Sequence, residues 1–174
     1  AYIDLNYNGI FWTSTQINSA SSYKRTMASS TGQINRSPIL SSTAISVRYI
    51  KDSESTVQDI DGNIYDVVTI GDQQLTKQNL SVTTYNDGTP IDLVTDNTSW
   101  ENLTSGAYCW YDNDSAMYHD DYGVLYNYYV VADSRNVCPT GWHVPSDDEF
   151  TALIDYLGED DNGVSLRETG TEHW

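Results

Sequence analysis

The 174-residue sequence predicts an α+β fold that is rich in strands and long irregular loops and has one well-defined helix, at about 146–157. Short apolar runs recur between turn-forming residues, a pattern typical of strands and hairpins. The segment 146–157 instead carries apolar residues at helical spacing. Only 19% of the residues are charged, while Tyr, Trp, Ser, Thr, Asn and Asp are abundant. This composition is typical of a turn-rich extracellular protein.

Residues 1–50 are expected to form strands joined by polar loops. The apolar run at 10–12 and the segment 23–27 are candidate strands, and 16–22 is expected to be a loop. Residues 44–50, AISVRYI, are rich in β-branched side chains, which favour a strand. The polar stretch KDSEST at 51–56 is expected to act as a linker.

From Val57 onward, turn residues divide the chain into hairpins. Asp61-Gly62-Asn63 separates apolar runs at 57–60 and 64–70, and Asn86-Asp87-Gly88 separates runs at 82–85 and 90–94. Both triplets are typical hairpin turns. Four further expectations follow in chain order: a helical turn around Trp100, an extended segment at 107–111, an acidic loop at 112–121, and a strand or a helix at 122–131.

The predicted helix has clear start and stop signals. Ser146 is placed as the N-cap, and Glu149 follows three residues later, as a capping box requires. One apolar stripe then occupies positions i, i+3, i+4 and i+7: Phe150, Leu153, Ile154 and Leu157. Asp147 and Asp148 in the first turn are expected to complement the helix dipole. Gly158 supplies the stop. The helix is therefore expected to lay its apolar stripe on a core built by the strands.

Charge excludes several classes of partner. The net charge of −17 argues against nucleic acid and anionic membrane surfaces, and no stretch approaches the length of a transmembrane helix. Residues 1–50 hold four basic residues and one acidic residue, a net charge of +3. Residues 51–174 hold four basic and twenty-four acidic residues, a net charge of −20. These two parts could attract each other within one molecule or between molecules.

The chain offers few candidates for chemistry. Calcium prefers several oxygen ligands, so an acidic group is a candidate calcium site: Asp112, Asp114, Asp120 and Asp121. A solvated acidic loop is the simpler interpretation. His119, His143 and His173 occur in no order typical of nucleophilic catalysis. We therefore expect no enzyme activity and no cofactor other than calcium.

Several motifs resemble one family, the Fibrobacter succinogenes major paralogous domain. They come in the family's order and cover most of 57–174: 59–80 (DIDGNIYDVVTIGDQQLTKQNL), 106–114 (GAYCWYDND), 122–129 (YGVLYNYY), 138–150 (CPTGWHVPSDDEF) and 166–174 (LRETGTEHW). The resemblance implies a C-type lectin-like fold, the fold shared with formylglycine-generating enzymes. Those enzymes use copper and a cysteine pair, which this chain does not reproduce, so their activity is not expected here.

The order of the chain departs from that family. Its C-terminal portion includes a segment of the type YWWSST and a last strand of the type FSVRCV. Here 11–15 (FWTST) resembles the first and 45–50 (ISVRYI) the second, so 1–50 is interpreted as C-terminal-type strands placed before a body at 57–174. Three arrangements fit: a circular permutant, a piece of a tandem array, or a polymer subunit whose residues 1–50 complete a neighbouring copy.

The resemblance also bears on the cysteines and on ligand binding. In lectin-like domains Cys138 would bridge to the last strand, where this chain has Tyr49. A Cys109–Cys138 disulfide and two buried free thiols both remain open. The surface displayed after the WSST-type motif implies ligand-binding residues at Gln16, Asn18, Ser21, Tyr23 and Arg25.

The sequence thus predicts a non-enzymatic, extracellular or cell-surface C-type lectin-like domain. Its expected role is structural or adhesive, as a repeat or subunit of a bacterial surface assembly or filament, by strand exchange with identical or homologous copies. The alternative is a monomeric, circularly permuted module that binds a carbohydrate or a surface protein.

Overall fold

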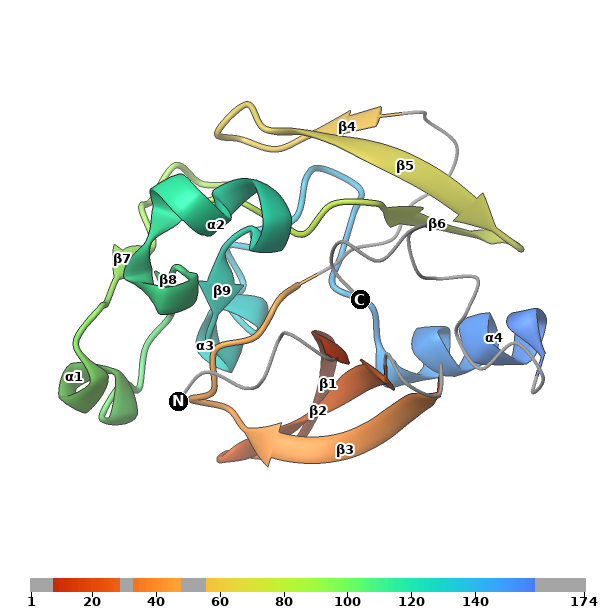
Figure 1. Ribbon diagram of the computed structural model, residues 1–174, viewed down its shortest axis with the longest axis horizontal. Helices are drawn as coiled ribbons and strands as arrows, with labels where there is room; N and C mark the ends of the chain where they lie inside the picture. The colour runs from red at the N-terminus through yellow and green to blue at the C-terminus, as the bar shows by residue number, and fades with distance from the viewer. Residues whose placement is uncertain (1–7, 29–32, 48–55, 159–174) are drawn as a thin grey trace.

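A computed structural model describes residues 8–28, 33–47 and 56–158 of the chain. Within these residues the fold is α+β, with three three-stranded sheets and several short helices. Figure 1 shows how these elements are arranged. The α+β class expected from the sequence is therefore confirmed. Some of the predicted features lie outside the described residues. They are the strand residues 48–50, which include Tyr49, the linker residues 51–55, and His173. No helix in the described ranges is long and apolar enough to cross a membrane.

The first sheet consists of β1 (Asn8–Asn18), β2 (Ser21–Ala28) and β3 (Ile34–Leu40), antiparallel and in that order. The loop expected at 16–22 is wrong, because Gln16 pairs with Ser22 and both strands continue to the end of the hairpin. Register shifts on either side of Gln16 mark bulges in β1. The hairpin end is exposed, so it shows no hydrophobic alternation that a sequence pattern could detect.

The second sheet confirms the hairpin predicted around Asp61-Gly62-Asn63. It contains β4 (Thr56–Gln58), β5 (Ile64–Ile70) and β6 (Gln73–Thr76). The buried Asp59 carboxylate closes the first turn, where it accepts hydrogen bonds from the Asn63 amide and the Tyr65 hydroxyl. The third sheet joins β7 (Asp92–Leu93), β8 (Ala107–Cys109) and β9 (Leu125–Tyr126).

Short helices lie between the strands of the body. As expected, α1 (Asn97–Glu101) forms around Trp100. The acidic loop expected at 112–121 is wrong, because η1 (Tyr111–Asn113) leads into α2 (Ser115–Tyr122). The Asp114 side chain caps α2 and accepts from the Met117 amide. This helix buries none of its residues and has no apolar stripe, so periodicity could not reveal it.

The ambiguous segment 122–131 is both strand and helix. β9 ends at Tyr126, Asn127 acts as an N-cap, and α3 (Tyr128–Val131) follows. The helix predicted at 146–157 is confirmed as α4 (Asp147–Leu157), with the complete Ser146–Glu149 capping box. Gly158 ends it with a positive φ of 83°, a conformation that glycine adopts without a steric penalty.

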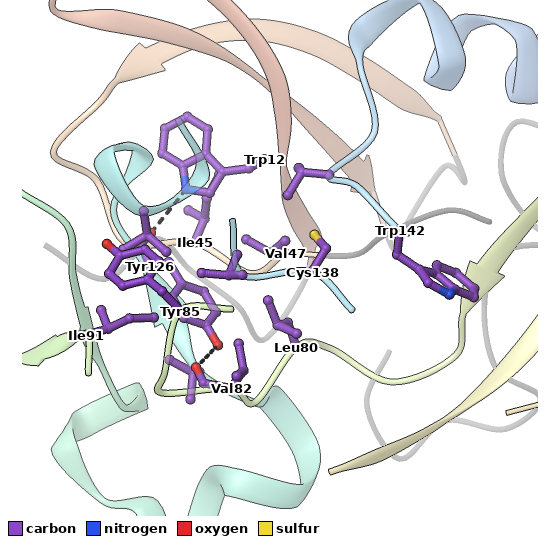
Figure 2. Packing of buried hydrophobic residues seen from close by; sticks show 14 of the residues in the cluster. Trp12, Ile45, Val47, Leu80, Val82, Tyr85, Ile91, Tyr126, Cys138 and Trp142 are labelled. Carbon is purple, nitrogen blue, oxygen red and sulfur yellow. Dashed lines mark hydrogen bonds between the residues drawn. The ribbon is translucent and has the colours of Figure 1, made fainter. Parts of the chain in front are cut away.

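The largest apolar cluster joins the two parts of the chain. From the first part it takes Ile10, Trp12, Ile45 and Val47, and from the second part it takes residues such as Leu80, Tyr126 and Cys138. Figure 2 shows Trp12, Ile45 and Val47 packed among these side chains. A second cluster places Phe11 and Met27 of the first sheet against Phe150 and Leu153 of α4. Both clusters therefore depend on residues from both parts of the chain.

Candidate functional site

The most extensively built site is the interface between residues 8–47, here called the N-terminal segment, and residues 56–158, here called the body. Backbone hydrogen bonds cross it at several places. The Leu80 amide donates to Val47 O (3.1 Å), Ser14 N to Pro145 O (2.8 Å) and Tyr128 N to Ser41 O (2.8 Å). Ile45 also forms an antiparallel bridge with Tyr126 of β9. The segment is thus hydrogen-bonded to the body as well as packed on it.

Trp12 anchors the segment in the core. Its side chain is fully buried, and its indole Nε1 donates to Tyr126 O over 3.1 Å. Its ring contacts that of Tyr128 at a centroid distance of 5.3 Å with the planes tilted by 60°. The Tyr128 hydroxyl donates to Ser14 O (3.0 Å), two residues along β1. Trp12 therefore makes apolar, aromatic and hydrogen-bond contacts with the body at once.

A group of three charged residues, here called the charged node, holds the segment to α4: Arg25, Arg36 and Asp147. The Asp147 carboxylate accepts from Arg25 Nε (3.1 Å) and Nη2 (2.9 Å) at one oxygen and from Arg36 Nε (2.7 Å) at the other. The side chains of Arg25 and Asp147 are only 7% and 6% exposed. Arg25 also donates to Asp147 O and Thr151 Oγ1. The buried charges are paired and hydrogen-bonded, as burial requires.

The structure separates the five predicted ligand-binding residues. Gln16 and Asn18 are exposed near the end of the β1–β2 hairpin, and Ser21 is half-buried beside them. Tyr23 carries the Arg36 guanidinium over its ring at 3.5 Å. Arg25 is buried and bound to Asp147, so its assignment to a displayed binding surface is wrong. Arg25 lies on the same face of β2 as Met27, which packs against Phe150 and Leu153, so it faces α4.

The four aspartates proposed as calcium ligands lie in η1, in α2 and at the junction between them. Asp114 caps α2, and the Asp120 carboxylate is 98% exposed and accepts from His119. Asp112 adopts a left-handed backbone conformation, with a φ of 49°. Among the described residues, no group of three or more His, Cys, Asp or Glu side chains is arranged to hold a metal ion. The four aspartates are therefore not brought together as a ligand set.

The two cysteines are free and buried in different clusters. Cys138 lies in the largest cluster, and Cys109 packs with residues such as Trp100 and Leu125. The Cys109–Cys138 disulfide considered above is thus not formed. Burial raises the pKa of the Cys109 thiol to about 12 and also raises the pKa of Cys138. Both thiols are therefore held in the unreactive protonated form.

The described histidines occupy structural positions. The His143 Nε2 lies 2.7 Å from Glu149 Oε1, so it supports the capping box of α4. The ring of His119 packs on Trp110 at a centroid distance of 5.4 Å. Neither is hydrogen-bonded to a cysteine or a serine hydroxyl in the described contacts, and neither arrangement is typical of nucleophilic catalysis.

Sequence reasoning missed two features of the site. It assigned Asp147 to the helix dipole alone, although an Asp at the start of a buried helix and an Arg within a buried strand could have suggested a pair. It also missed the contacts among Tyr111, Tyr118 and Tyr122, whose ring centroids lie 4.9 to 5.7 Å apart and attach α2 to η1. The i, i+4 spacing of Tyr118 and Tyr122 was the available signal.

Comparison with known proteins identifies the family. The sequence profile of the Fibrobacter succinogenes major domain matches residues 68–173, more than half of the chain. The protein therefore belongs to this family, as the motifs had indicated. No curated protein and no solved structure matches the chain. The match begins within β5, so the whole N-terminal segment precedes the matched region.

Proposed function

We propose that this protein is a non-enzymatic, extracellular structural or adhesive module of a bacterial surface assembly, in which the N-terminal segment joins neighbouring copies. The observation that carries the proposal is the position of the segment. It lies outside the family match, yet Ile10, Trp12, Ile45 and Val47 complete the largest core cluster. A body without a segment would expose apolar surface that another copy's segment can cover.

The segment is suited to exchange as a unit. In the described residues, the strand pairs of β1, β2 and β3 lie within the segment, so its sheet can leave one body and dock on another intact. Residues 8–47 contain Lys24, Arg25 and Arg36 and no acidic residue, whereas the remainder of the chain is strongly acidic. Opposite charge favours encounter between the segment of one copy and the body of another. Exchange of identical elements is a known route to self-association.

Self-association is tested with the full chain. Two batches, labelled with a donor or an acceptor dye at an exposed position of the segment or the body, are unfolded together and refolded over a range of concentrations. We expect energy transfer between copies and masses above 19.5 kDa in light scattering, rising with concentration. A single species of that mass with no energy transfer at any concentration would contradict the proposal.

A second candidate is a monomeric module that binds a carbohydrate or a surface protein. It is favoured by the contacts of the segment with its own body, which leave the hairpin end with Gln16 and Asn18 exposed. A glycan array probed with and without calcium tests it. Binding that is lost in a Gln16→Ala, Asn18→Ala variant would support this candidate, and no binding in either condition would count against it.

A further inference from the structure

The charged node forms an ionic contact between the segment and the body. Both of its arginines come from the segment, and its one carboxylate comes from the first residue of α4. The Asp147 amide donates to Thr15 Oγ1 of the segment over 2.9 Å. Figure 1 shows the β1–β3 sheet and α4 next to each other. The node therefore fixes the position of the sheet relative to the start of α4.

This contact distinguishes a matching segment from others more sharply than apolar packing does. An apolar surface accepts many side chains of about the right size. A buried carboxylate without its arginine is strongly unfavourable, because it loses water and gains no partner. Because both charges lose water on burial, an intact buried ion pair adds little net stability. Removal of one partner is nevertheless costly, because the other charge stays buried without compensation. The best-attested role of buried ion pairs is to fix register and partner choice.

The charged node also requires the correct strand register in the β1–β3 sheet. Phe11, Arg25 and Arg36 lie opposite one another across β1, β2 and β3. A slip of one residue in β2 would turn Arg25 to the other face of the sheet, away from Asp147. The node is thus complete only when the strand register and the docking of the segment are both correct.

We propose that the charged node selects which segment the body accepts: a segment with arginine at the positions of Arg25 and Arg36, from this chain or from a second copy of it. The part that concerns a second copy rests on the proposed function. Two experiments separate the role of the node from the exchange itself.

The first experiment stays within one chain. In an Arg36→Gln background, which removes the second arginine, Arg25→Glu and Asp147→Lys are made singly and together. Each single variant places like charges at a buried contact. Relative to the Arg36→Gln protein, it should lower the folded-to-unfolded ratio by on the order of a hundredfold or more. The double variant reverses the pair and should recover most of that loss. The exposed Asp148→Lys, one residue along the helix, is the matched control and should change the ratio by less than about fivefold.

A second pair of variants covers the case in which the reversed pair does not fold. Arg25→Met and Asp147→Leu together replace the pair by apolar side chains and should fold at least nearly as well as the parent. Arg25→Met alone leaves the Asp147 carboxylate buried without Arg25 and should fold much less well. If the effects of the single changes simply add in both pairs, the node does not select the segment and the inference is overturned.

The second experiment mixes two chains, one with Arg25→Glu and one with Asp147→Lys, both with Arg36→Gln. Each carries a mismatched node alone, but exchange gives one reversed pair and one parent pair. We expect a 1:1 complex of about twice 19.5 kDa that forms only in the mixture. If wild-type copies exchange but this mixture shows no preference, the node is not selective. If wild-type copies do not exchange while the single-chain rescue succeeds, the assembly proposal fails and the node keeps its role within the chain.

Discussion

Truncation of Trp12 measures how far the body depends on the N-terminal segment. Trp12 is fully buried, contacts Tyr128 and donates to Tyr126 O. Burial of so large an aromatic side chain predicts that Trp12→Ala lowers the free energy of unfolding by about 3–5 kcal/mol. Trp12→Phe keeps much of the packing but leaves Tyr126 O without the indole donor, so we expect a smaller loss of about 1–3 kcal/mol.

Urea unfolding followed by far-ultraviolet circular dichroism is the appropriate assay, because the substitutions also remove a fluorophore. Ile17→Ala on the same strand is the matched control. Ile17 is 39% exposed, so its truncation should change the free energy of unfolding by less than about 1 kcal/mol. A loss below about 1 kcal/mol for Trp12→Ala would refute the conclusion that the segment is an integral part of the core.

Three further predictions concern the body. Gly106→Ala should lower the melting temperature, because a Cβ there would overlap the Tyr85 hydroxyl and lie 3.1 Å from Val130 Cγ2; Tyr85→Phe should relieve part of this loss. Cys109 and Cys138 should not react with a thiol reagent at pH 8 until the protein is unfolded, since burial raises both pKa values; rapid native labelling would contradict their burial. Burial tends to raise the pKa of Glu149, but hydrogen bonds from Ser146 and His143 outweigh it, and the net shift is downward. Glu149→Ala should therefore cost about 1 kcal/mol at pH 7, and this difference should disappear as the pH falls below the ordinary pKa of a glutamate and through the lower folded-state pKa; a constant difference in urea unfolding would argue against it.

Local signals in the sequence were sufficient for elements that local chemistry determines. The Ser146–Glu149 capping box and the apolar stripe of α4 predicted that helix to within a residue. The Asp61-Gly62-Asn63 turn likewise predicted the β4–β5 hairpin. In both cases the residues that specify the element contact one another within a few positions of the chain.

Elements and contacts that depend on distant residues could not be predicted in this way. α2 is held by a capping aspartate and by tyrosine contacts to η1, and it has no apolar stripe to detect. The pairing of Arg25 with Asp147 joins residues 122 positions apart. Sequence alone therefore assigned Arg25 to a displayed surface and Asp147 to a helix dipole, since each residue is plausible in isolation.

The start of the family match at residue 68 has a practical consequence for how the limits of this domain are drawn. A boundary placed there would cut β5 between Val67 and Val68, discard β4 and remove every segment residue that covers Leu80 and Tyr126. Such a fragment would keep most of the recognisable motifs of its family but lose six of the 18 buried residues in the largest apolar cluster. For this protein, similarity in sequence delimits a recognisable region, and the hydrophobic core extends back at least to β1.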